Sequence, residues 1–377
     1  MSMETESRTA RHELIALLRE IDQRWSGPEW NLHSAQDVVG SHRALMHILE
    51  AGLVGYFEQN ASNPDFRRIV TPSRKLTGDN SDAIYFDAPV SPDHSYVIHG
   101  TLEGAAYFSL TIEVGAEDGH MASNTAGVIN DNDLEIDSNG HFTLYLGGEP
   151  RTTNWLALAP GSSRVTTRHY FEDTSAAAMN PDLEPRMRIE CLSATAAPPP
   201  PDDASVAAGI RRVCNAVRSR TLGMPPMANS EPPPFLSLTP NTFPVPIPPG
   251  DFGLAAFDAH YSMAPFFIDS DQALVITGRW PECRFGNVCL WNRFQQTLDY
   301  TRRSVSLNRA QTKLEKDGSF RIVIAHEDPG LPNWLDTEGN PFGLVFWRFF
   351  LAQGEVSAPQ ASVVKLAELG KGQASGD

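Results

Sequence analysis

The sequence predicts a mainly β protein built from two related antiparallel β-sandwiches of jelly-roll-like form, preceded by a helical region and joined by a proline-rich, partly helical linker. Three observations favour this fold class: many prolines and glycines (29 and 28 of 377 residues), segments whose apolar residues recur at every second position, and a long internal repeat. Proline and glycine favour turns, and a period of two is typical of strands. The length suggests about two domains with a sizeable core.

Residues 1–80 are expected to form an N-terminal helical region. Within residues 9–25, apolar side chains recur at helical spacing and would form one buried stripe. These side chains are Leu14, Leu17, Leu18 and Ile21. Residues 34–59 predict a second helical region, in which Ser34 followed by Asp37 has the pattern of a helix N-cap. Glycines inside this second region could divide it.

The alternating segments begin near residue 82. YFSLTIEV, residues 107–114, places four apolar side chains on one face and four more polar ones, from Tyr107 to Glu113, on the other. HFTLYL (141–146) and SFRIVIA (319–325) alternate in the same way. This pattern is typical of half-buried antiparallel strands, with one face on a core and the other toward solvent.

The two sandwiches are expected at residues 81–195 and 251–355, with the linker at residues 196–250. The linker contains two proline-rich stretches, which cannot join the interior of a sheet. Between them, residues 204–222 have apolar side chains at the spacing of an amphipathic helix. Residues 356–377 are expected to form a C-terminal tail.

An internal repeat is the strongest signal in the sequence. Residues 93–112 align with residues 271–290 without a gap, and residues 140–171 align with residues 318–350 with small gaps. The offset is 178 residues at the first matched pair (271 − 93) and 180 residues at the last (348 − 168). The identical pairs are Asp93/Asp271, Gly100/Gly278, Gly140/Gly318, Phe142/Phe320, Asn154/Asn333, Trp155/Trp334, Leu156/Leu335 and Arg168/Arg348. So many ordered matches predict two copies of one fold, each with a hydrophobic face to cover.

The repeated segments resemble a known family. The resemblance is carried by DGSFRIVIAHEDPGLPNWLDTEG (317–339), by the following strand LVFWRFFL (344–351) and by YVIHGTL (96–102) in the first copy. These segments are similar to the bacterial domain-of-unknown-function 1214 family, which is often paired with the 1254 family. The resemblance covers most of residues 80–352 and implies two jelly-roll-like sandwiches. It transfers no catalytic residues, because none is established for that family.

The composition limits the partners and the location of the protein. A net charge of −16 argues against nucleic acid and anionic membranes, which are themselves negative. The polar N-terminus lacks the apolar stretch of a signal peptide, and no run approaches 18 apolar residues. The four cysteines have no zinc-type CxxC spacing, which favours free cytoplasmic thiols. We expect a cytoplasmic protein whose partner is a small-molecule ligand, and a homo-oligomer is compatible with the sequence.

The candidate catalytic segment is residues 324–339, which gathers many polar side chains around prolines and glycines. His326 continues the inward phase of the preceding strand and could form a general acid–base pair with Asp328. The first copy has Gly148 and Pro150 at these positions. Polar residues found in one copy only are better candidates for function than residues found in both. The alternative is a core histidine bonded to a loop carbonyl.

Arg348 is the third candidate catalytic residue. It interrupts the apolar strand LVFWRFFL, and a buried guanidinium requires a carboxylate or carbonyl partner. Asp328 or Asp336 could supply a structural ion pair. Alternatively, Arg348 could hold an anionic or carbonyl oxygen of a substrate.

Six further residues are candidates for substrate binding. They are Asp336, Trp334, Asn333, His99, Tyr107 and Arg168. Asn333 and Trp334 recur in the first copy, which favours a structural role in which the indole closes a sandwich end and the amide binds loop backbone. His99, Tyr107 and Arg168 could line one cleft if their strands are neighbours. The alternative for these three is a mixture of surface and edge-strand side chains.

Three classes of function remain open. HxH, HExxH and GxSxG motifs are missing, as is GxGxxG before a helix, so we expect neither a metal nor a cofactor. An enzyme without a cofactor could perform acid–base chemistry, as a hydro-lyase, isomerase, cyclase or hydrolase, on a hydrophobic or mixed-polarity small molecule in a cleft of the sandwiches. The alternatives are a non-catalytic carbohydrate- or lipid-binding protein and a structural or partner-binding protein.

Overall fold

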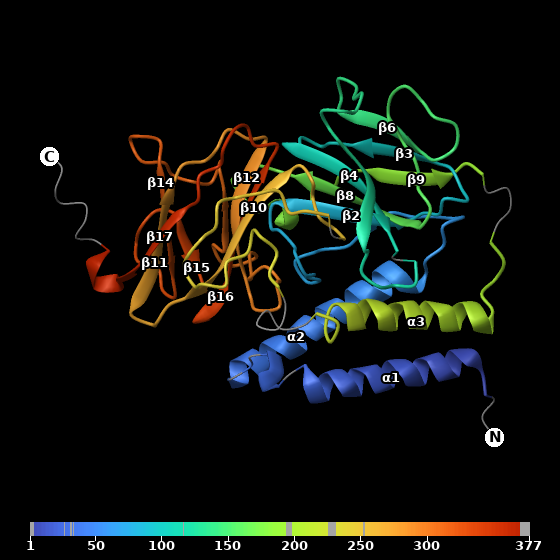
Figure 1. Cartoon of the computed structure of the whole chain (residues 1–377), viewed down its shortest axis with the longest axis horizontal. Coiled ribbons are helices and arrows are strands. Elements are labelled where there is room, and N and C mark those ends of the chain that lie inside the picture. The colour runs from blue at the N-terminus through green and yellow to red at the C-terminus, as the bar shows by residue number, and fades with distance from the viewer. Residues whose placement is uncertain are drawn as a thin grey trace.

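The computed structural model of the chain describes residues 4–25, 27–30, 32, 34–115, 117–193, 198–224, 231–251 and 253–369. Two β-sandwiches stand side by side, and three helices lie together along one side of the molecule (Figure 1). The described residues form four sheets, two in each sandwich. The protein is therefore mainly β, with a helical N-terminus and two related sandwiches, as the sequence predicts.

The first sandwich contains nine strands in two sheets. The strands are β1 (Arg67–Arg68), β2 (Ala83–Pro89), β3 (Tyr96–Thr101), β4 (Tyr107–Val114), β5 (Asn124–Asn130), β6 (His141–Leu146), β7 (Trp155–Leu156), β8 (Ser162–Tyr170) and β9 (Met187–Cys191). The inner sheet, which faces the other sandwich, has the order β1-β2-β8-β4-β5, and the outer sheet has the order β7-β6-β3-β9. Apolar side chains of both sheets, such as Leu110 and Leu144, form the core between them.

The second sandwich repeats this plan with eight strands. They are β10 (Ala259–Phe267), β11 (Gln272–Gly278), β12 (Phe285–Trp291), β13 (Ser306–Asn308), β14 (Phe320–Ala325), β15 (Trp334–Asp336), β16 (Phe342–Phe350) and β17 (Gln360–Lys365). The inner sheet has the order β10-β16-β12-β13, and the outer sheet has the order β15-β14-β11-β17. Its own core includes Ile322 and Trp347, one from each sheet.

The chain alternates between the two sheets in the same way in both sandwiches. In the first, β2, β4 and β8 are inner strands and β3, β6 and β9 are outer ones; in the second, β10, β12 and β16 are inner and β11, β14 and β17 are outer. This alternation makes both sandwiches jelly-roll-like. Neighbouring strands are antiparallel except at the short parallel pairs β6–β7 and β14–β15. The two copies therefore share their topology as well as their sequence.

The two inner sheets pack against each other and form a third core at the junction. This core joins Tyr107 and Tyr170 of the first sandwich to Phe285, Phe346 and Phe350 of the second. Tyr107 stacks on Phe350 with ring centroids 4.3 Å apart. The junction also explains a departure from the sequence prediction. Strand β4 is buried on both faces, because the second sandwich and residues packed around it cover the face that the alternation assigned to solvent.

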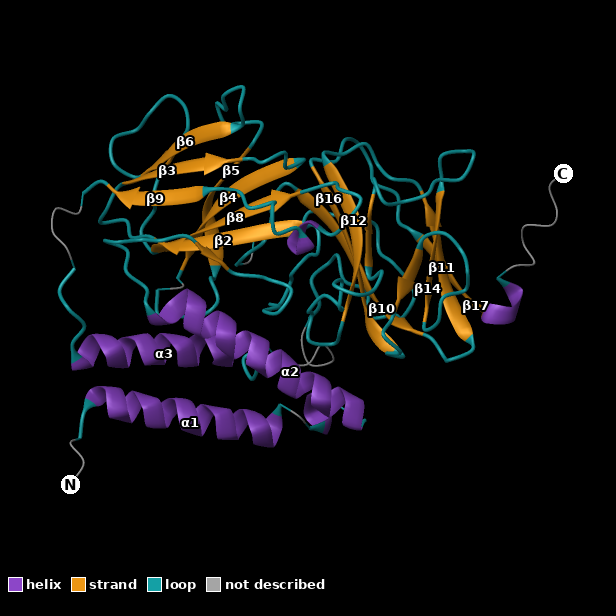
Figure 2. Ribbon diagram, turned by 180° about the vertical axis from the view of Figure 1, so that it is seen from behind, coloured by secondary structure: helices purple, strands orange, loops and turns teal. Residues whose placement is uncertain are grey.

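Three helices pack together beside the first sandwich (Figure 2). They are α1 (Glu6–Arg24), α2 (Ala35–Gly52) and α3 (Asp203–Ser219). Their apolar faces share a core that includes Ile21, Ile48 and Val217. Ser34 and Asp37 form a capping box at the start of α2, as the sequence predicts, and the helix continues as a π-helical turn over Leu53–Phe57.

Three short 3-10 helices complete the regular structure of the described residues, at Pro28–Trp30 (η1), Ala177–Met179 (η3) and Leu366–Glu368 (η5). Among the helices that the structure describes, none combines the length and the apolar character that crossing a membrane requires.

Two strands lie outside the sandwich boundaries that the sequence predicts. β17 belongs to the segment 356–377, expected to be a tail, yet it pairs with β11 along its whole length. β1 belongs to residues 1–80, expected to be helical, and pairs with β2. β17 is an edge strand that is mostly exposed, so its sequence carries little apolar alternation. Its pairing is decided by the neighbouring strand rather than by its own pattern.

Candidate functional site

A cavity of about 320 Å³ lies at the junction of the two inner sheets. This volume is in the range of small-molecule sites. Strands of both sandwiches form its wall, together with residues that precede β2 and β10. Most of the lining is apolar or aromatic. The polar side chains in the wall are Thr77, Asp79, Tyr85, Thr166, Arg168, Tyr170, Tyr261, Gln295 and Arg348.

Two Tyr–Arg pairs, one from each sandwich, line the cavity. Tyr85 of β2 lies directly opposite Arg168 of β8 in the antiparallel register. Tyr261 of β10 lies opposite Arg348 of β16 in the same way. The two pairs occupy equivalent positions of the repeat and line one cavity from opposite sandwiches, as residues related by a pseudo-twofold axis would. A site at such an axis draws the same residue from both copies.

The two arginines bind the opposite sandwich reciprocally. Arg348 donates from Nη2 to the carbonyl oxygen of Gly78 (2.7 Å), and Arg168 donates from Nη2 to the carbonyl oxygen of Leu254 (2.8 Å). Gly78 and Leu254 each lie five residues before the first residue of their strand, β2 or β10, and both have positive φ, +88° and +67°. Equivalent turns therefore present equivalent carbonyl groups. These bonds fasten the two sandwiches together around the cavity.

Arg348 lies in an aromatic setting. Its side chain is 3% exposed, and its guanidinium carbon lies 4.3 Å from the ring centroid of Phe346 and 5.1 Å from that of Trp291. These distances are within cation–π range. Its Nη1 is buried and has no hydrogen-bond partner within the part of the chain that the structure describes. A buried donor without a partner costs about 1–3 kcal/mol. The adjoining cavity is where an acceptor could be supplied.

Arg168 lies in a polar setting. Its Nη1 donates to Thr111 Oγ1 (2.9 Å), which in turn donates to Glu113 Oε1 (2.8 Å). Glu113 is completely buried and also accepts the backbone N–H of Leu254 (3.2 Å). Burial lowers the pKa of the Arg168 guanidinium, but the attraction of Glu113 and of nearby phenols outweighs burial and the pKa rises. The charge of Arg168 is thus balanced inside the protein.

The phenols of the cavity are neutral hydrogen-bonding groups. The hydroxyl oxygens of Tyr85 and Tyr170 are 2.9 Å apart, and the two rings meet edge to face. Burial raises the pKa of Tyr85 well above 10 and the pKa of Tyr261 to about 12. Both groups therefore keep their protons at neutral pH and add no negative charge beside the arginines.

Asp79 supplies the carboxyl group of the cavity wall. Its Oδ1 accepts the backbone N–H (2.7 Å) and the hydroxyl (2.8 Å) of Thr297, whereas its Oδ2 is buried without a partner among the described residues. Burial raises the pKa of Asp79, against the attraction of Lys75 and the bonds from Thr297. Asp79 follows Gly78, whose carbonyl oxygen binds Arg348. A carboxyl group and a guanidinium therefore share one region of the wall.

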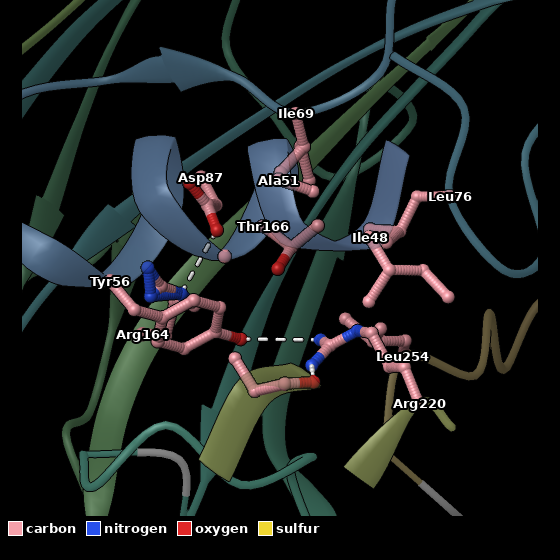
Figure 3. Close-up of a pocket in the computed structure, with 12 residues that line it drawn as sticks. Ile48, Ala51, Tyr56, Ile69, Leu76, Asp87, Arg164, Thr166, Arg220 and Leu254 are labelled. Carbon is pink, nitrogen blue, oxygen red and sulfur yellow. Dashed lines mark hydrogen bonds and ion pairs between the residues drawn. The ribbon is translucent and has the colours of Figure 1, made fainter. Parts of the chain in front are cut away.

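A smaller cavity of about 30 Å³ adjoins this wall and shares four lining residues with it, Ile69, Leu76, Thr166 and Leu254. Figure 3 shows Arg164 bonded to Asp87 and Arg220 bonded to Tyr56 at this place. The Arg164–Asp87 ion pair (2.9 Å) is almost completely buried, and Arg220 donates to the Tyr56 hydroxyl (3.2 Å). The volume suits about one water molecule. Arg164 also donates to the carbonyl oxygen of Gly55 (2.5 Å) and so ties the turn after α2 to the inner sheet, and Arg220 ties the end of α3 to the same turn.

His326 and Asp328 lie outside the cavity. His326 follows β14, where its Nδ1 is 2.6 Å from Thr337 Oγ1 and its Nε2 is 3.2 Å from the carbonyl oxygen of Ile268. Asp328 is exposed and accepts the backbone N–H of Gly330 (2.8 Å). Both nitrogens of His326 are thus engaged, one within the corner that residues 324–339 form and the other by the residue that follows β10. The structure does not gather the predicted acid–base pair and Arg348 at one place.

The ion pair considered for Arg348 does not form among the described residues. Asp336 pairs with Arg303 instead (2.6 Å), and Asp328 is engaged in its own turn. The reason is topological. Asp336 ends β15 in the outer sheet, whereas Arg348 lies on β16 in the inner sheet, so the core of the sandwich separates them.

Asn333 and Trp334 bind loop backbone in the second sandwich. Asn333 accepts the backbone N–H of Lys313 (2.8 Å) and donates to its carbonyl oxygen (2.7 Å), while Trp334 donates to the last carbonyl oxygen of β14 (3.1 Å). Asn154 and Trp155 make the same set of bonds in the first sandwich. Both asparagines have positive φ. This is the loop-closing role that the repeat suggested as the alternative to substrate binding.

The structure brings Tyr107 and Arg168 onto neighbouring strands and leaves His99 apart. β4 pairs with β8 in the inner sheet, whereas His99 lies exposed on β3 of the outer sheet, beside Thr143 (3.1 Å). Tyr107 donates to Asp258 Oδ2 (2.5 Å) within the junction. Of the residues predicted as catalytic or substrate-binding, Arg168 and Arg348 line the cavity.

The sequence also contains a signal for the cavity tyrosines that the aligned segments miss. DAIYFDAP (82–89) and DAHYSMAP (258–265) share an aspartate, two alanines, a tyrosine and a proline at a constant offset of 176 (258 − 82). The shared tyrosines are Tyr85 and Tyr261. Extending the repeat to β2 and β10 would have found them. The preference for polar residues found in one copy only passes over these two tyrosines, because they occupy equivalent positions in both copies.

The donor set of the cavity suits an anion. Arginine presents planar N–H donors that match a carboxylate or another oxyanion. Within the described residues, no group of three or more His, Cys, Asp or Glu side chains has an arrangement that could hold a metal ion.

Comparisons with known proteins agree with this architecture. The model of the family described as "Protein of unknown function (DUF1214)" matches residues 82–173 and 271–353, one segment in each sandwich. The structure is similar to that of an uncharacterized protein from Burkholderia cenocepacia, with a TM-score of 0.77 and 25% identity over 96% of this chain and 98% of that chain. It is also similar to a protein from Vibrio parahaemolyticus, with a TM-score of 0.50 and 14% identity over 85% of this chain and 100% of that chain. The comparison with curated proteins found no match.

Proposed function

We propose that this chain, which belongs to the DUF1214 family, binds a small molecule with an anionic oxygen group and an apolar body in the cavity between its two sandwiches. The observation that carries the proposal is Arg348, a buried cation with an unpartnered Nη1 in the wall of an apolar cavity. A carboxylate or a similar oxyanion would satisfy both the charge and the donor.

The rest of the wall supports an apolar body. Aromatic and thioether side chains from both sandwiches and from the linker surround the cavity, and they include Phe235, Met263, Trp291 and Phe346. Such side chains offer a large contact area and adapt to irregular shapes. Most of the wall is apolar or aromatic, and several of its polar groups are already bonded within the protein, so the wall favours an amphipathic acid over a sugar.

The charges of the wall favour an anion over a neutral ligand. Arg168 is balanced by Glu113, whereas Arg348 has no carboxylate within ion-pair distance among the described residues. In a poorly polarisable cavity, a cation without an ion-pair partner attracts an anion far more strongly than it does in water. The site would therefore select an anion although the whole protein carries a net charge of −16.

An enzyme that performs acid–base chemistry without a cofactor is the second candidate. The observation that favours it is Asp79, a buried carboxyl group with a raised pKa in the wall of the same cavity. Perturbed carboxyl groups in cavities are frequent acid–base catalysts. In this case the carboxyl group of the cavity would take the role that the sequence assigned to His326 and Asp328.

The proposal is tested by calorimetric titration of the protein with trans-cinnamate, an apolar carboxylate that fits the volume. Cinnamamide, which has the same shape without the charge, serves as the matched neutral probe. We expect cinnamate to bind, cinnamamide to bind more weakly, and Arg348→Met to weaken cinnamate binding by roughly 10- to 100-fold, the value of one hydrogen bond to a charged group.

Arg188→Met is the matched control, because Arg188 is an exposed arginine of the outer sheet that pairs with Glu190. This variant should bind cinnamate as the wild type does. Failure of the wild type to bind cinnamate, or equal binding by the wild type and Arg348→Met, would overturn the proposed function.

A further inference from the structure

Asp79 is a departure from the symmetry of the cavity. Residues 77–79 before β2 correspond to residues 253–255 before β10, and all six residues line the wall. The position equivalent to Asp79 is occupied by Ala255. The turn itself therefore does not require a carboxyl group, since the second copy builds it without one. A buried carboxyl group that the turn does not require is a candidate for a role toward a ligand.

The carboxyl group is only half satisfied by the protein. Thr297 binds Oδ1 through two hydrogen bonds, and Oδ2 is buried without a partner among the described residues. The nearby Arg348 is bonded to the carbonyl oxygen of Gly78 and likewise has one unpartnered nitrogen. Asp79 and Arg348 form no ion pair with each other, although both line the cavity. One acceptor and one donor thus lack partners in the same wall.

The other charged and titratable groups around Asp79 are engaged elsewhere. Lys75 donates from Nζ to the carbonyl oxygens of Thr297 and Leu298, both at 2.7 Å, and its Nζ lies 3.9 Å from the ring centroid of Tyr300. Lys75 attracts Asp79 without binding it, and burial lowers the pKa of Lys75 itself. Burial raises the pKa of Tyr300 and keeps this phenol neutral. Of these groups, Arg348 is the one that lines the cavity together with Asp79.

An anion bound at Arg348 would place a second negative charge beside Asp79. Two carboxylates in a low-dielectric site cannot both stay ionised at low cost, so one of them takes a proton. The pKa of Asp79 is already raised by burial before an anion binds, which makes Asp79 the group to be protonated. A protonated carboxyl group can donate one hydrogen bond, and this bond would satisfy Oδ2 and an anionic oxygen together.

We propose that Asp79 takes up one proton from solvent when an anion binds at Arg348, and that it donates Oδ2–H to that anion. The proton bonds to Oδ2, and no covalent bond of the ligand forms or breaks. The inference rests on the proposed function, because it requires an anion beside Arg348. It adds that binding is coupled to proton uptake and that Asp79 is the residue that exchanges the proton.

Calorimetric titration with trans-cinnamate in HEPES and in Tris, at matched ionic strength between pH 6 and pH 9, measures the number of protons taken up per cinnamate bound. The two buffers differ in ionisation enthalpy. The heats observed in the two buffers therefore differ by the number of protons taken up multiplied by the difference between the two ionisation enthalpies. We expect wild-type uptake to rise toward one proton as the pH rises, with affinity falling by up to roughly tenfold per pH unit. Asp79→Asn should bind with almost no proton uptake and with a flat pH profile.

Two further variants complete the experiment. Asp79→Ala copies the second sandwich, where Ala255 occupies the equivalent turn, and it should also abolish proton uptake. Asp182→Asn changes an exposed carboxylate and should leave uptake unchanged. Cinnamate binding without proton uptake, or uptake that persists in both Asp79 variants, would overturn this inference and leave the proposed function standing. Absence of cinnamate binding in the wild type would overturn both.

Discussion

The two sandwiches present the same Tyr–Arg pair to the junction in different surroundings. The residues beside Arg168 on its own and the neighbouring strand are Thr111, Glu113 and Thr166, whereas the equivalent residues beside Arg348 are Cys289, Trp291 and Phe346. Besides the bond that each arginine makes to the opposite sandwich, Arg168 therefore has a polar partner in its own sandwich, whereas Arg348 is surrounded by aromatic rings and has one donor left over. The difference teaches how a repeat can divide its roles: Arg168 is embedded in a polar network, and Arg348 keeps a donor free for the ligand that we propose.

The aspartates that precede β2 and β10, Asp82 and Asp258, also bind the opposite sandwich reciprocally. Asp82 of the first sandwich accepts a hydrogen bond from Asn287 of the second (2.9 Å), and Asp258 of the second accepts bonds from Tyr107 (2.5 Å) and Asn130 (3.0 Å) of the first. Each sandwich thus places an equivalent carboxyl group against the inner sheet of the other. The partners differ, so the two contacts need not contribute equally to stability.

The largest expected effect comes from removing the balanced arginine. Arg168→Met would leave Glu113 as an uncompensated buried charge. It would also remove the hydrogen bonds that Arg168 donates to the Leu254 carbonyl oxygen and to the Thr111 hydroxyl. We expect a loss of about 3–5 kcal/mol in the free energy of unfolding, as for other broken buried pairs. Arg348→Met should cost less than about 2 kcal/mol, because a methionine suits its aromatic surroundings and no carboxylate is left unpaired. Urea denaturation at pH 7 measures both.

Equal losses for the two methionine variants would contradict the division of roles. A larger loss of unfolding free energy for Arg348→Met than for Arg168→Met would reverse the division of roles. The comparison also separates stability from binding, because Arg348→Met is expected to lose cinnamate affinity while keeping most of its stability.

Asp82 should make stability fall as pH rises toward neutrality. Burial raises its pKa to about 7, against the hydrogen bonds from Asn287 and Asn308 that lower it. An unfolded chain releases this proton near the ordinary pKa of about 4, so between about pH 4 and pH 7 the folded state binds more protons than the unfolded state. Stability therefore decreases through this window, and the penalty is fully present above pH 7.

Asp82→Asn removes the titration and keeps an oxygen that can accept from Asn287. We expect the variant to be more stable than the wild type by about 2 kcal/mol at pH 8, with the difference shrinking as pH falls toward 5. Chemical denaturation at several pH values measures the difference. A stability difference that does not change between pH 5 and pH 8 would show that Asp82 is not the titrating group.

The sequence predicts the fold well because both sandwiches carry local signals. Strict alternation in segments such as residues 107–114, the capping pair Ser34 and Asp37, and the ordered repeat each specify an element or a copy. These signals act within a strand, a helix end or one sandwich. They are therefore readable without knowing how the two copies meet.

The candidate site was harder to predict because it depends on how the two copies meet. Arg168 and Arg348 could be selected as buried charges, but nothing local shows that they converge on one cavity. Asp79 lies in a turn before β2 and gains its meaning from the opposite sandwich, through Thr297 and Arg348. His326 has the local pattern of a catalytic group, yet Thr337 and Ile268 engage both of its nitrogens.

The smallest expected effect tests the tyrosines of the two pairs. The Tyr85 hydroxyl shares a hydrogen bond with Tyr170, so Tyr85→Phe should lose about 1 kcal/mol of unfolding free energy and leave Tyr170 without that partner. The Tyr261 hydroxyl has no such bond among the described residues, and Tyr261→Phe should change stability by less than about 0.5 kcal/mol. Urea denaturation of both phenylalanine variants measures the difference. If Tyr261→Phe instead weakened cinnamate binding while Tyr85→Phe did not, the Tyr261 hydroxyl would join Arg348 as a ligand donor, and the second sandwich would supply both polar contacts to the anion.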